Sequence, residues 1–90
     1  MRGKERAELR REANTLNPIF QIGKGDIGDN LIDAVDSALK KRELIKLSIL
    51  ETANVTTKEA ANLIAGATGA EIIQCIGPRF VLYRENPEKE

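Results

Sequence analysis

Three glycines at G-x-G-x-x-G spacing mark the stretch QIGKGDIGDN, residues 21–30. They are Gly23, Gly25 and Gly28, and Lys24 lies between the first two. Glycine lets a backbone come close to a phosphate, the first N–H groups of a helix lack partners within the helix, and a lysine adds positive charge. The stretch therefore predicts a phosphate-binding loop at the start of a helix.

Two ligands could present a phosphate to such a loop. A dinucleotide cofactor is favoured by the glycine spacing and by Glu51, an acidic residue further along the chain that could hold a ribose. Gln21 argues against it, because it interrupts a strand that should be a continuous apolar run. An RNA backbone is the other ligand, since short G-x-x-G loops clamp nucleic-acid backbones. A tight turn without a ligand, with Asp26 or Asp29 capping the helix, is the third alternative.

The composition indicates one small domain without catalytic chemistry. The chain has 90 residues, of which 14 are basic and 14 acidic, no histidine and a single cysteine, Cys75. It therefore lacks the side chain best suited to proton transfer at neutral pH, and it cannot form a multi-cysteine metal site. No apolar run is long enough for a signal peptide or a membrane span. We expect a soluble, cytoplasmic protein with no catalytic residue, cofactor or metal.

Apolar periodicity and turn motifs predict seven elements. TTKE at 56–59 forms a capping box that opens the third helix, and Gly69 is expected to end this helix in a left-handed conformation. Gly77-Pro78 predicts a type II′ turn between the last two strands. The order α-β-α-β-α-β-β predicts an α/β fold with three helices and a mixed four-stranded sheet. The other expected ranges are helix 4–14, strand 19–22, helix 27–41, strand 43–51, strand 70–76 and strand 79–85.

Alternation along the strand at 43–51 separates its two faces. We expect the second and third helices to cover the face with Ile45, Leu47 and Ile49. We expect the first helix to cover the other face, at Leu44 and Leu50.

The same patterns predict the surroundings of other apolar residues. Phe80 and Tyr83 should be split between the two faces of the last strand, and Cys75 should be buried. The third helix should present an apolar face made of Ala60, Leu63, Ile64 and Ala67.

Three separated motifs resemble one family. IGKGD leads into an amphipathic helix, RELIK follows at 42–46, and IGPRFVLYR covers 76–84. In this order the motifs are similar to the CRM domain (chloroplast RNA splicing and ribosome maturation), in particular to its stand-alone bacterial form, the YhbY-like proteins. The resemblance runs from the first helix through Arg84. It implies a fold like the C-terminal domain of the third translation initiation factor. It also implies RNA binding, to precursors of the large ribosomal subunit in bacteria and to intron RNA in plant organelles.

The resemblance places the family's G-x-x-G loop on Gly23, Lys24, Gly25 and Asp26. Asp26 stands where the family usually has a glycine, and its carboxylate repels phosphate. Gly28, two residues on, restores backbone freedom but not the charge. These five residues form the first part of the predicted RNA-binding site.

Basic side chains elsewhere complete the predicted RNA-binding site. They are Lys40, Lys41, Arg42, Arg79 and Arg84. Ordinary solvation is the alternative for each, and the negative end of the helix is a sufficient partner for residues 40–42. The row of Asp29, Asp33 and Asp36 on the same helix is either a magnesium site or an exposed face that limits nonspecific binding.

From these patterns we predict a single RNA-binding domain at 1–85, followed by a polar tail at 86–90. The resemblance implies that the domain binds ribosomal RNA or a precursor of the large subunit, and we expect it to act as a monomer, without catalysis and without a membrane. Two alternatives stay open: a nucleotide-binding enzyme that uses the glycine spacing, and a module that docks on a protein during ribosome assembly.

Overall fold

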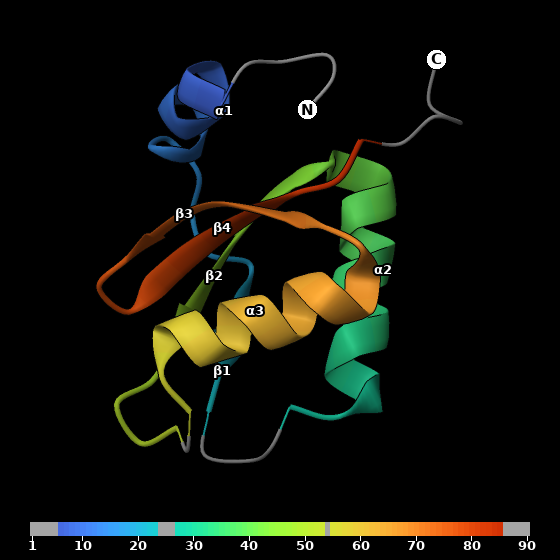
Figure 1. Ribbon diagram of the computed structural model, residues 1–90, viewed down its shortest axis with the longest axis vertical. Coiled ribbons are helices and arrows are strands. Elements are labelled where there is room, and N and C mark those ends of the chain that lie inside the picture. Colours follow the sequence, from blue (N-terminus) through green and yellow to red (C-terminus); the bar gives the residue numbers. More distant parts are fainter. Residues whose placement is uncertain (1–5, 24–26, 54, 86–90) are drawn as a thin grey trace.

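The computed structural model describes residues 6–23, 27–53 and 55–85. In this part of the chain a four-stranded sheet carries α1 on one face and α2 and α3 on the other (Figure 1). This architecture confirms the predicted α/β fold and element order. The elements are α1 (Arg6–Ala13), β1 (Phe20–Ile22), α2 (Asp29–Arg42), β2 (Leu44–Ile49), α3 (Thr57–Thr68), β3 (Glu71–Ile76) and β4 (Arg79–Tyr83).

The strand order is β1-β2-β4-β3, which makes the sheet mixed, as predicted. β1 pairs with β2 in parallel, whereas β4 is antiparallel to both of its neighbours, β2 and β3. The hairpin between β3 and β4 turns at Gly77, whose φ of 56° is the positive value that a type II′ turn requires at its first central residue. β1 and β3 therefore form the two edges of the sheet.

The main core lies between the sheet and the helices α2 and α3. β2 alternates strictly, so Ile45, Leu47 and Ile49 are all buried on this side, as predicted. α2 adds Val35 and Leu39 to the same core. Burial of these side chains fixes α2 and α3 against one face of the sheet and leaves the other face to α1 alone.

α3 begins and ends where the sequence predicts. Thr56 and Glu59 form both hydrogen bonds of the capping box, and Gly69 ends the helix with a φ of 74°. The predicted apolar face is wrong in part, because Leu63 is 51% exposed and Ala67 is exposed. The helix instead buries a face rotated toward small side chains, which let it lie close to the sheet: Ala60, Ala61, Ile64, Ala65 and Thr68.

A second, smaller core lies under α1. Its buried residues are Leu9, Ala13, Ile73, Val81 and Tyr83, and Leu44 packs against them, as predicted. The prediction that α1 covers Leu50 is wrong, since Leu50 is 40% exposed. β2 ends at Ile49, and an α1 of eight residues reaches only one half of this face of the sheet.

The aromatic residues of β4 lie on opposite faces, which confirms their predicted split. Phe80 belongs to the main core and Tyr83 to the core under α1. The predicted burial of Cys75 is wrong, because this residue is exposed. Cys75 lies near the hairpin on β3, an edge strand that has a neighbour on one side only.

Candidate nucleic-acid interface

The predicted phosphate-binding loop joins β1 to α2. Gly23 directly follows β1, and Gly28 is the N-cap of α2 with a φ of −109°. The alternative that Asp26 or Asp29 caps the helix is wrong, because Gly28 holds that position and Asp29 is the first helical residue. Lys24, Gly25 and Asp26 lie outside the described residues.

The described glycines leave the start of α2 open. Among the described residues, no atom lies within 4 Å of a Cβ added at Gly28, and a Cβ added at Gly23 would make an ordinary contact of 3.6 Å with Leu50 Cδ1. Gly28 also has no side chain that could accept hydrogen bonds from the first N–H groups of α2. Gly28 itself therefore offers no side chain that would compete with an anion for the backbone donors at this end of the helix.

The features that favoured a dinucleotide or a metal acquire no such role in the described structure. Glu51 is exposed in the turn after β2. In the ranges 6–23, 27–53 and 55–85, no three Asp, Glu, Cys or His side chains gather closely enough to hold a metal ion. No helix within these ranges is long and apolar enough to cross a membrane.

The predicted basic residues do not form one cluster with the loop. Residues 40–42 lie in the last turn of α2, and a helix of 14 residues is about 21 Å long, so they stand at the opposite end from Gly28. Arg79, the first residue of β4, lies at the loop end of the sheet. Two hydrogen bonds show this: Leu50 N–H donates to the carbonyl of Ile22, just before the loop, at 2.9 Å, and the adjacent Ile49 N–H donates to the carbonyl of Pro78, just before Arg79, at 2.7 Å. The structure thus places Arg79 near the loop end and residues 40–42 far from it.

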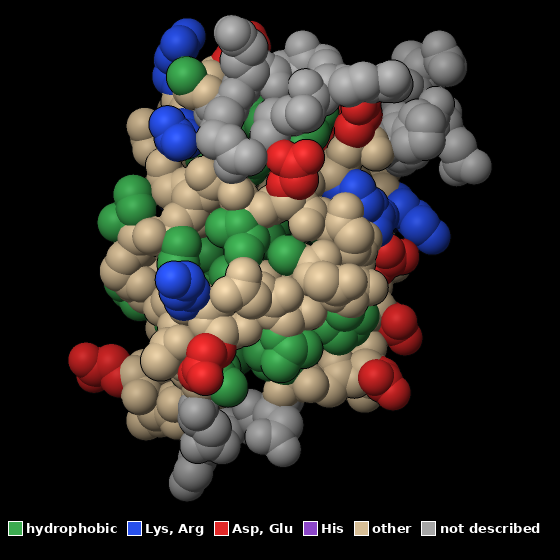
Figure 2. Space-filling view, viewed as in Figure 1, with side chains coloured by type: hydrophobic (Ala, Val, Ile, Leu, Met, Phe, Trp, Pro, Cys, Tyr) green, Lys and Arg blue, Asp and Glu red, His purple; other side chains and the backbone are tan. Residues whose placement is uncertain are grey.

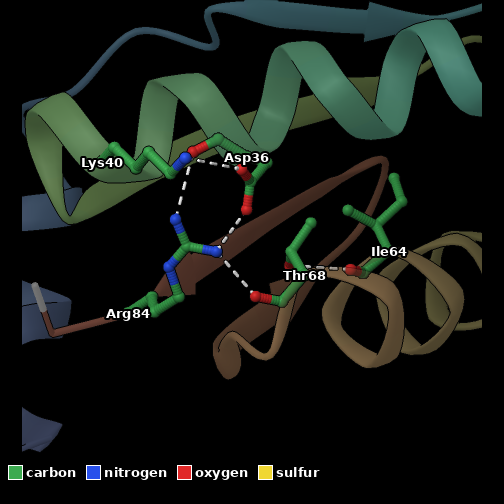
Figure 3. Close-up of polar contacts among 5 residues, drawn as sticks. All are labelled: Asp36, Lys40, Ile64, Thr68 and Arg84. Carbon is green, nitrogen blue, oxygen red and sulfur yellow. Dashed lines mark hydrogen bonds and ion pairs between the residues drawn. The ribbon is translucent and has the colours of Figure 1, made fainter.

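Arg84 lies in a part-buried polar cluster, where its guanidinium reaches both α2 and the end of α3 (Figure 3). Its Nη1 donates to Asp36 Oδ1 at 2.6 Å and to the Thr68 carbonyl at 2.7 Å, and Nη2 donates to the Asp36 carbonyl at 3.1 Å. Thr68 is the last residue of α3, so the guanidinium supplies the cation that this helix end lacks in its own last turn. Arg84 therefore ties α2, α3 and the end of β4 together.

The charge of Asp36 is stabilised by this cluster. The hydrogen bond from Arg84 is the main cause that holds the pKa of the Asp36 carboxyl below its ordinary value, against an opposing effect of burial. The charges of Arg84 and of Lys40 lower this pKa further. Lys40 Nζ lies 3.5 Å from Asp36 Oδ2, so Lys40 is also engaged with the cluster.

The acidic row on α2 is divided by these contacts. Asp29 and Asp33 are exposed, whereas Asp36 is held by Arg84. Figure 2 shows acidic side chains along the right-hand edge, over α2, with basic side chains nearer its upper end. This side of the molecule therefore carries charges of both signs next to one another.

Lys46 is a candidate that the sequence prediction did not include. It lies in the middle of β2, on the face that α1 only partly covers, and its Nζ donates to the Leu16 carbonyl at 3.3 Å. The signal was present in the alternation of ELIKLSILE, because Lys46 and Ser48 interrupt the apolar character of the face that begins with Leu44. A strand face that changes from apolar to polar along its length is covered at one end and open at the other.

With the fold and the candidate residues placed, comparison with known proteins defines the class. The CRS1/YhbY (CRM) domain matches residues 1–84. The chain therefore belongs to the CRM domain family, as its three motifs predicted.

Relatives of similar length share this domain. The Bacillus subtilis protein named "Probable RNA-binding protein YqeI" is 39% identical over 88 residues, which cover 98% of this chain and 92% of that protein. A Haemophilus influenzae protein named "RNA-binding protein" is 31% identical and covers 94% of this chain and 86% of its own length. The solution structure of the Staphylococcus aureus protein SAV1595, described as a candidate for RNA binding, has 42% identity and a TM-score of 0.79, over 100% of this chain and 94% of that one.

Proposed function

We propose that this chain is a noncatalytic RNA-binding protein of the cytoplasm, acting as a monomer on ribosomal RNA of the large subunit or its precursor. The observation that carries the proposal is the match to the CRM domain along nearly the whole chain, with bacterial relatives that are named RNA-binding proteins. The choice of ribosomal RNA rests on the family resemblance of the three motifs.

The loop between β1 and α2 is proposed as one contact with the RNA backbone. The proposal is supported by Gly28 at the N-cap, which leaves the first N–H groups of α2 without a capping side chain, and by the adjacent sequence Gly23-Lys24-Gly25. Arg42 and Arg79 add positive charge at the two ends of the sheet. Arg84 is left out of the proposed interface, because its guanidinium is already bonded to Asp36 and Thr68.

Charge reversal at Lys24 tests the loop. Lys24→Glu should weaken binding to a structured fragment of large-subunit RNA about tenfold, because a phosphate contact is lost and a repulsion is added. The melting temperature should not fall. Arg10→Glu is the matched control, since it makes the same change at an exposed position on α1, at the other end of the sheet. Equal affinities of wild type and Lys24→Glu would remove the loop from the proposal.

Asp26→Gly tests the departure from the family pattern in the opposite direction. Removing the carboxylate should tighten binding to the same RNA several-fold, because the repulsion of phosphate is lost. Affinities measured from 50 to 300 mM salt separate this charge effect from a change in shape. Weaker binding by Asp26→Gly would show that the aspartate contributes to the contact.

Nuclease treatment distinguishes RNA from protein as the partner. If the chain still sediments with ribosomal particles after nuclease treatment, the partner is a protein and the proposal of RNA binding fails.

A further inference from the structure

The half of the sheet that α1 leaves uncovered carries an ordered set of polar and basic side chains. Its residues lie in two rows across the strands, because cross-strand partners share a face. The outer row, in register from β1 to β3, is Gln21, Ser48, Arg79 and Ile76. The inner row is Lys46 on β2 and Gln74 on β3, on either side of Val81, which is itself buried in the core under α1. Ile19 lies beside Lys46, because the Ile19 N–H donates to the Lys46 carbonyl at 2.9 Å. We call these two rows, together with Arg42, the open sheet surface.

Three connected hollows follow this surface. Their volumes are about 320, 190 and 370 Å³. Neighbouring hollows share lining residues, namely Lys46, Ile19 and Arg79, so the hollows form one continuous depression bordered by the segment 14–18 between α1 and β1. The first hollow extends to Arg42 at the end of α2. The depression therefore runs from the end of α2 to the start of β4.

The charges that line this depression are all positive. Arg42, Lys46 and Arg79 line it, and the lining includes no aspartate or glutamate among the described residues. This is unlike the chain as a whole, in which 14 basic residues are balanced by 14 acidic ones. A concave surface lined by one sign of charge concentrates the opposite charge, so the depression is complementary to a polyanion.

The cations of the open sheet surface are also available to a ligand. Arg42 and Arg79 are exposed, and within the described ranges neither has an ion pair or a side-chain hydrogen bond. Lys46 uses one of its three donors on the Leu16 carbonyl and so is held over the depression with donors to spare. These three side chains differ from Arg84 and Lys40, which are engaged with Asp36.

We propose that the open sheet surface binds a single-stranded segment of RNA. This inference rests on the proposed RNA-binding function and adds a site separate from the glycine loop. The three cations would contact phosphates, while the amides of Gln21 and Gln74 and the hydroxyl of Ser48 present donors and acceptors to base edges. Ile19 and Ile76, which are 39% and 64% exposed, add apolar contact for ribose and base faces.

The dimensions and side chains favour a single strand. β2 has six residues and is about 20 Å long, which is the length of about six stacked nucleotides at about 3.4 Å each. Separate bases can enter hollows and expose their edges to amides, whereas the edges of a duplex are paired and recognised mainly by shape. Phe80 and Tyr83 are buried, and Phe20, which borders the third hollow, packs against the main core, so stacking on this surface falls mainly to the planar guanidinium groups of Arg42 and Arg79.

The proposal also connects residues that the sequence placed in one site and the fold separates. Arg42 lies at the far end of α2 from the glycine loop, and Arg79 lies at the loop end of the sheet. Lys46 stands between them on β2. One strand of RNA along the open sheet surface would therefore contact both ends of the predicted site.

The test measures binding of two labelled RNAs by fluorescence anisotropy: a 12-nucleotide RNA without self-complementarity and its 12-base-pair duplex. The variant Arg42→Gln/Lys46→Gln/Arg79→Gln should bind the single strand about 30- to 100-fold more weakly than wild type. The slope of log affinity against log salt concentration should become shallower by about 2, since each phosphate contact contributes about 0.7.

Two further variants serve as controls. Lys58→Gln removes a charge from an exposed position on α3, across the sheet, and should change neither the affinity nor the salt slope. Arg42→Gln/Arg79→Gln keeps the Lys46 contact with Leu16 and should lose about tenfold with an unchanged melting temperature.

The outcomes separate this inference from the proposed function. Unchanged binding of the single strand by the triple variant, with weaker binding by Lys24→Glu, would overturn the inference and leave the proposed function in place. The same follows if wild type binds ribosomal RNA fragments but not the 12-nucleotide RNA. A duplex bound as tightly as the single strand, and weakened equally in the triple variant, would overturn the assignment to single strands. Wild type that binds none of these RNAs would contradict both.

Discussion

Two arginines at opposite ends of β4 have different surroundings. Arg79 is the first residue of the strand, is exposed, and lines a depression whose described lining carries no acidic side chain. Arg84 follows the strand, and its side chain is only 21% exposed and bonded to Asp36 and Thr68. Both were equal candidates for RNA binding in the sequence, since both are cations in one motif, IGPRFVLYR.

The difference lies in what each arginine is bonded to. Arg84 joins three elements of one domain, and its charge is largely neutralised by Asp36, so little of its field reaches a ligand. The Arg79 side chain has no hydrogen bond or ion pair with a described residue, and its field acts together with that of Lys46 along the same depression. Substitutions at the two positions should therefore separate stability from RNA binding.

Arg84→Met should give the largest change in stability. The variant keeps the aliphatic length of arginine but leaves the carbonyls of Asp36 and Thr68 without these hydrogen bonds. A loss of about 1 kcal/mol lowers the melting temperature by about 4–8 °C in a domain of this size. RNA affinity of the folded variant should stay within about twofold of wild type. Thermal melts followed by circular dichroism measure the first quantity.

The matched variant Arg79→Met should show the opposite pattern. Its melting temperature should stay within about 2 °C of wild type, as expected for an exposed substitution, while affinity for single-stranded RNA falls several-fold. Equal losses of melting temperature in Arg79→Met and Arg84→Met would contradict the division between the two regions.

Acid should weaken the cluster of Arg84 and Asp36 but not the open sheet surface. The pKa of Asp36 is lowered in the folded state, so the unfolded chain takes up this proton at a higher pH than the folded one. The stabilisation is complete above about pH 5 and is lost as the pH falls below 4 toward the lowered pKa. Urea unfolding should therefore show a difference between wild type and Asp36→Asn at pH 6 that shrinks at pH 3. Asp33→Asn removes an exposed carboxylate from the same helix and is the control.

Local patterns predicted most of the fold. The capping box at Thr56, the left-handed Gly69 and the alternation in β2 each depend on residues a few positions apart, and the structure contains all three. The errors at Leu50 and Leu63 concern what covers a side chain, which depends on the length of α1 and on how closely α3 approaches the sheet. Element types were therefore readable from the sequence, whereas burial at the margins of the core was not.

The candidate site was predicted less well for a related reason. The residues that engage Arg84 lie 48 and 16 positions away in the sequence, so nothing in its own motif shows that it is paired. Lys46 could have been found from the polar interruption in β2, but its proximity to Arg79 depends on the register of β2 with β4. Partnering of charges is a property of the fold, and it decides which basic residues can meet a ligand.

Ser48→Glu would give the open sheet surface the acidic partner that it lacks. Ser48 lies directly opposite Arg79 in the register of β2 and β4, so the new carboxylate would face the guanidinium across the strands. Such a cross-strand pair is worth about 0.2–1 kcal/mol, and the melting temperature should stay the same or rise by a few degrees. Affinity for the single-stranded RNA should nevertheless fall about tenfold, because the pair neutralises Arg79 and adds repulsion in the depression. Ser48→Gln has a similar size without the charge and should keep most of the affinity. If Ser48→Glu binds RNA as tightly as Ser48→Gln, the absence of acidic residues from this surface has no bearing on binding.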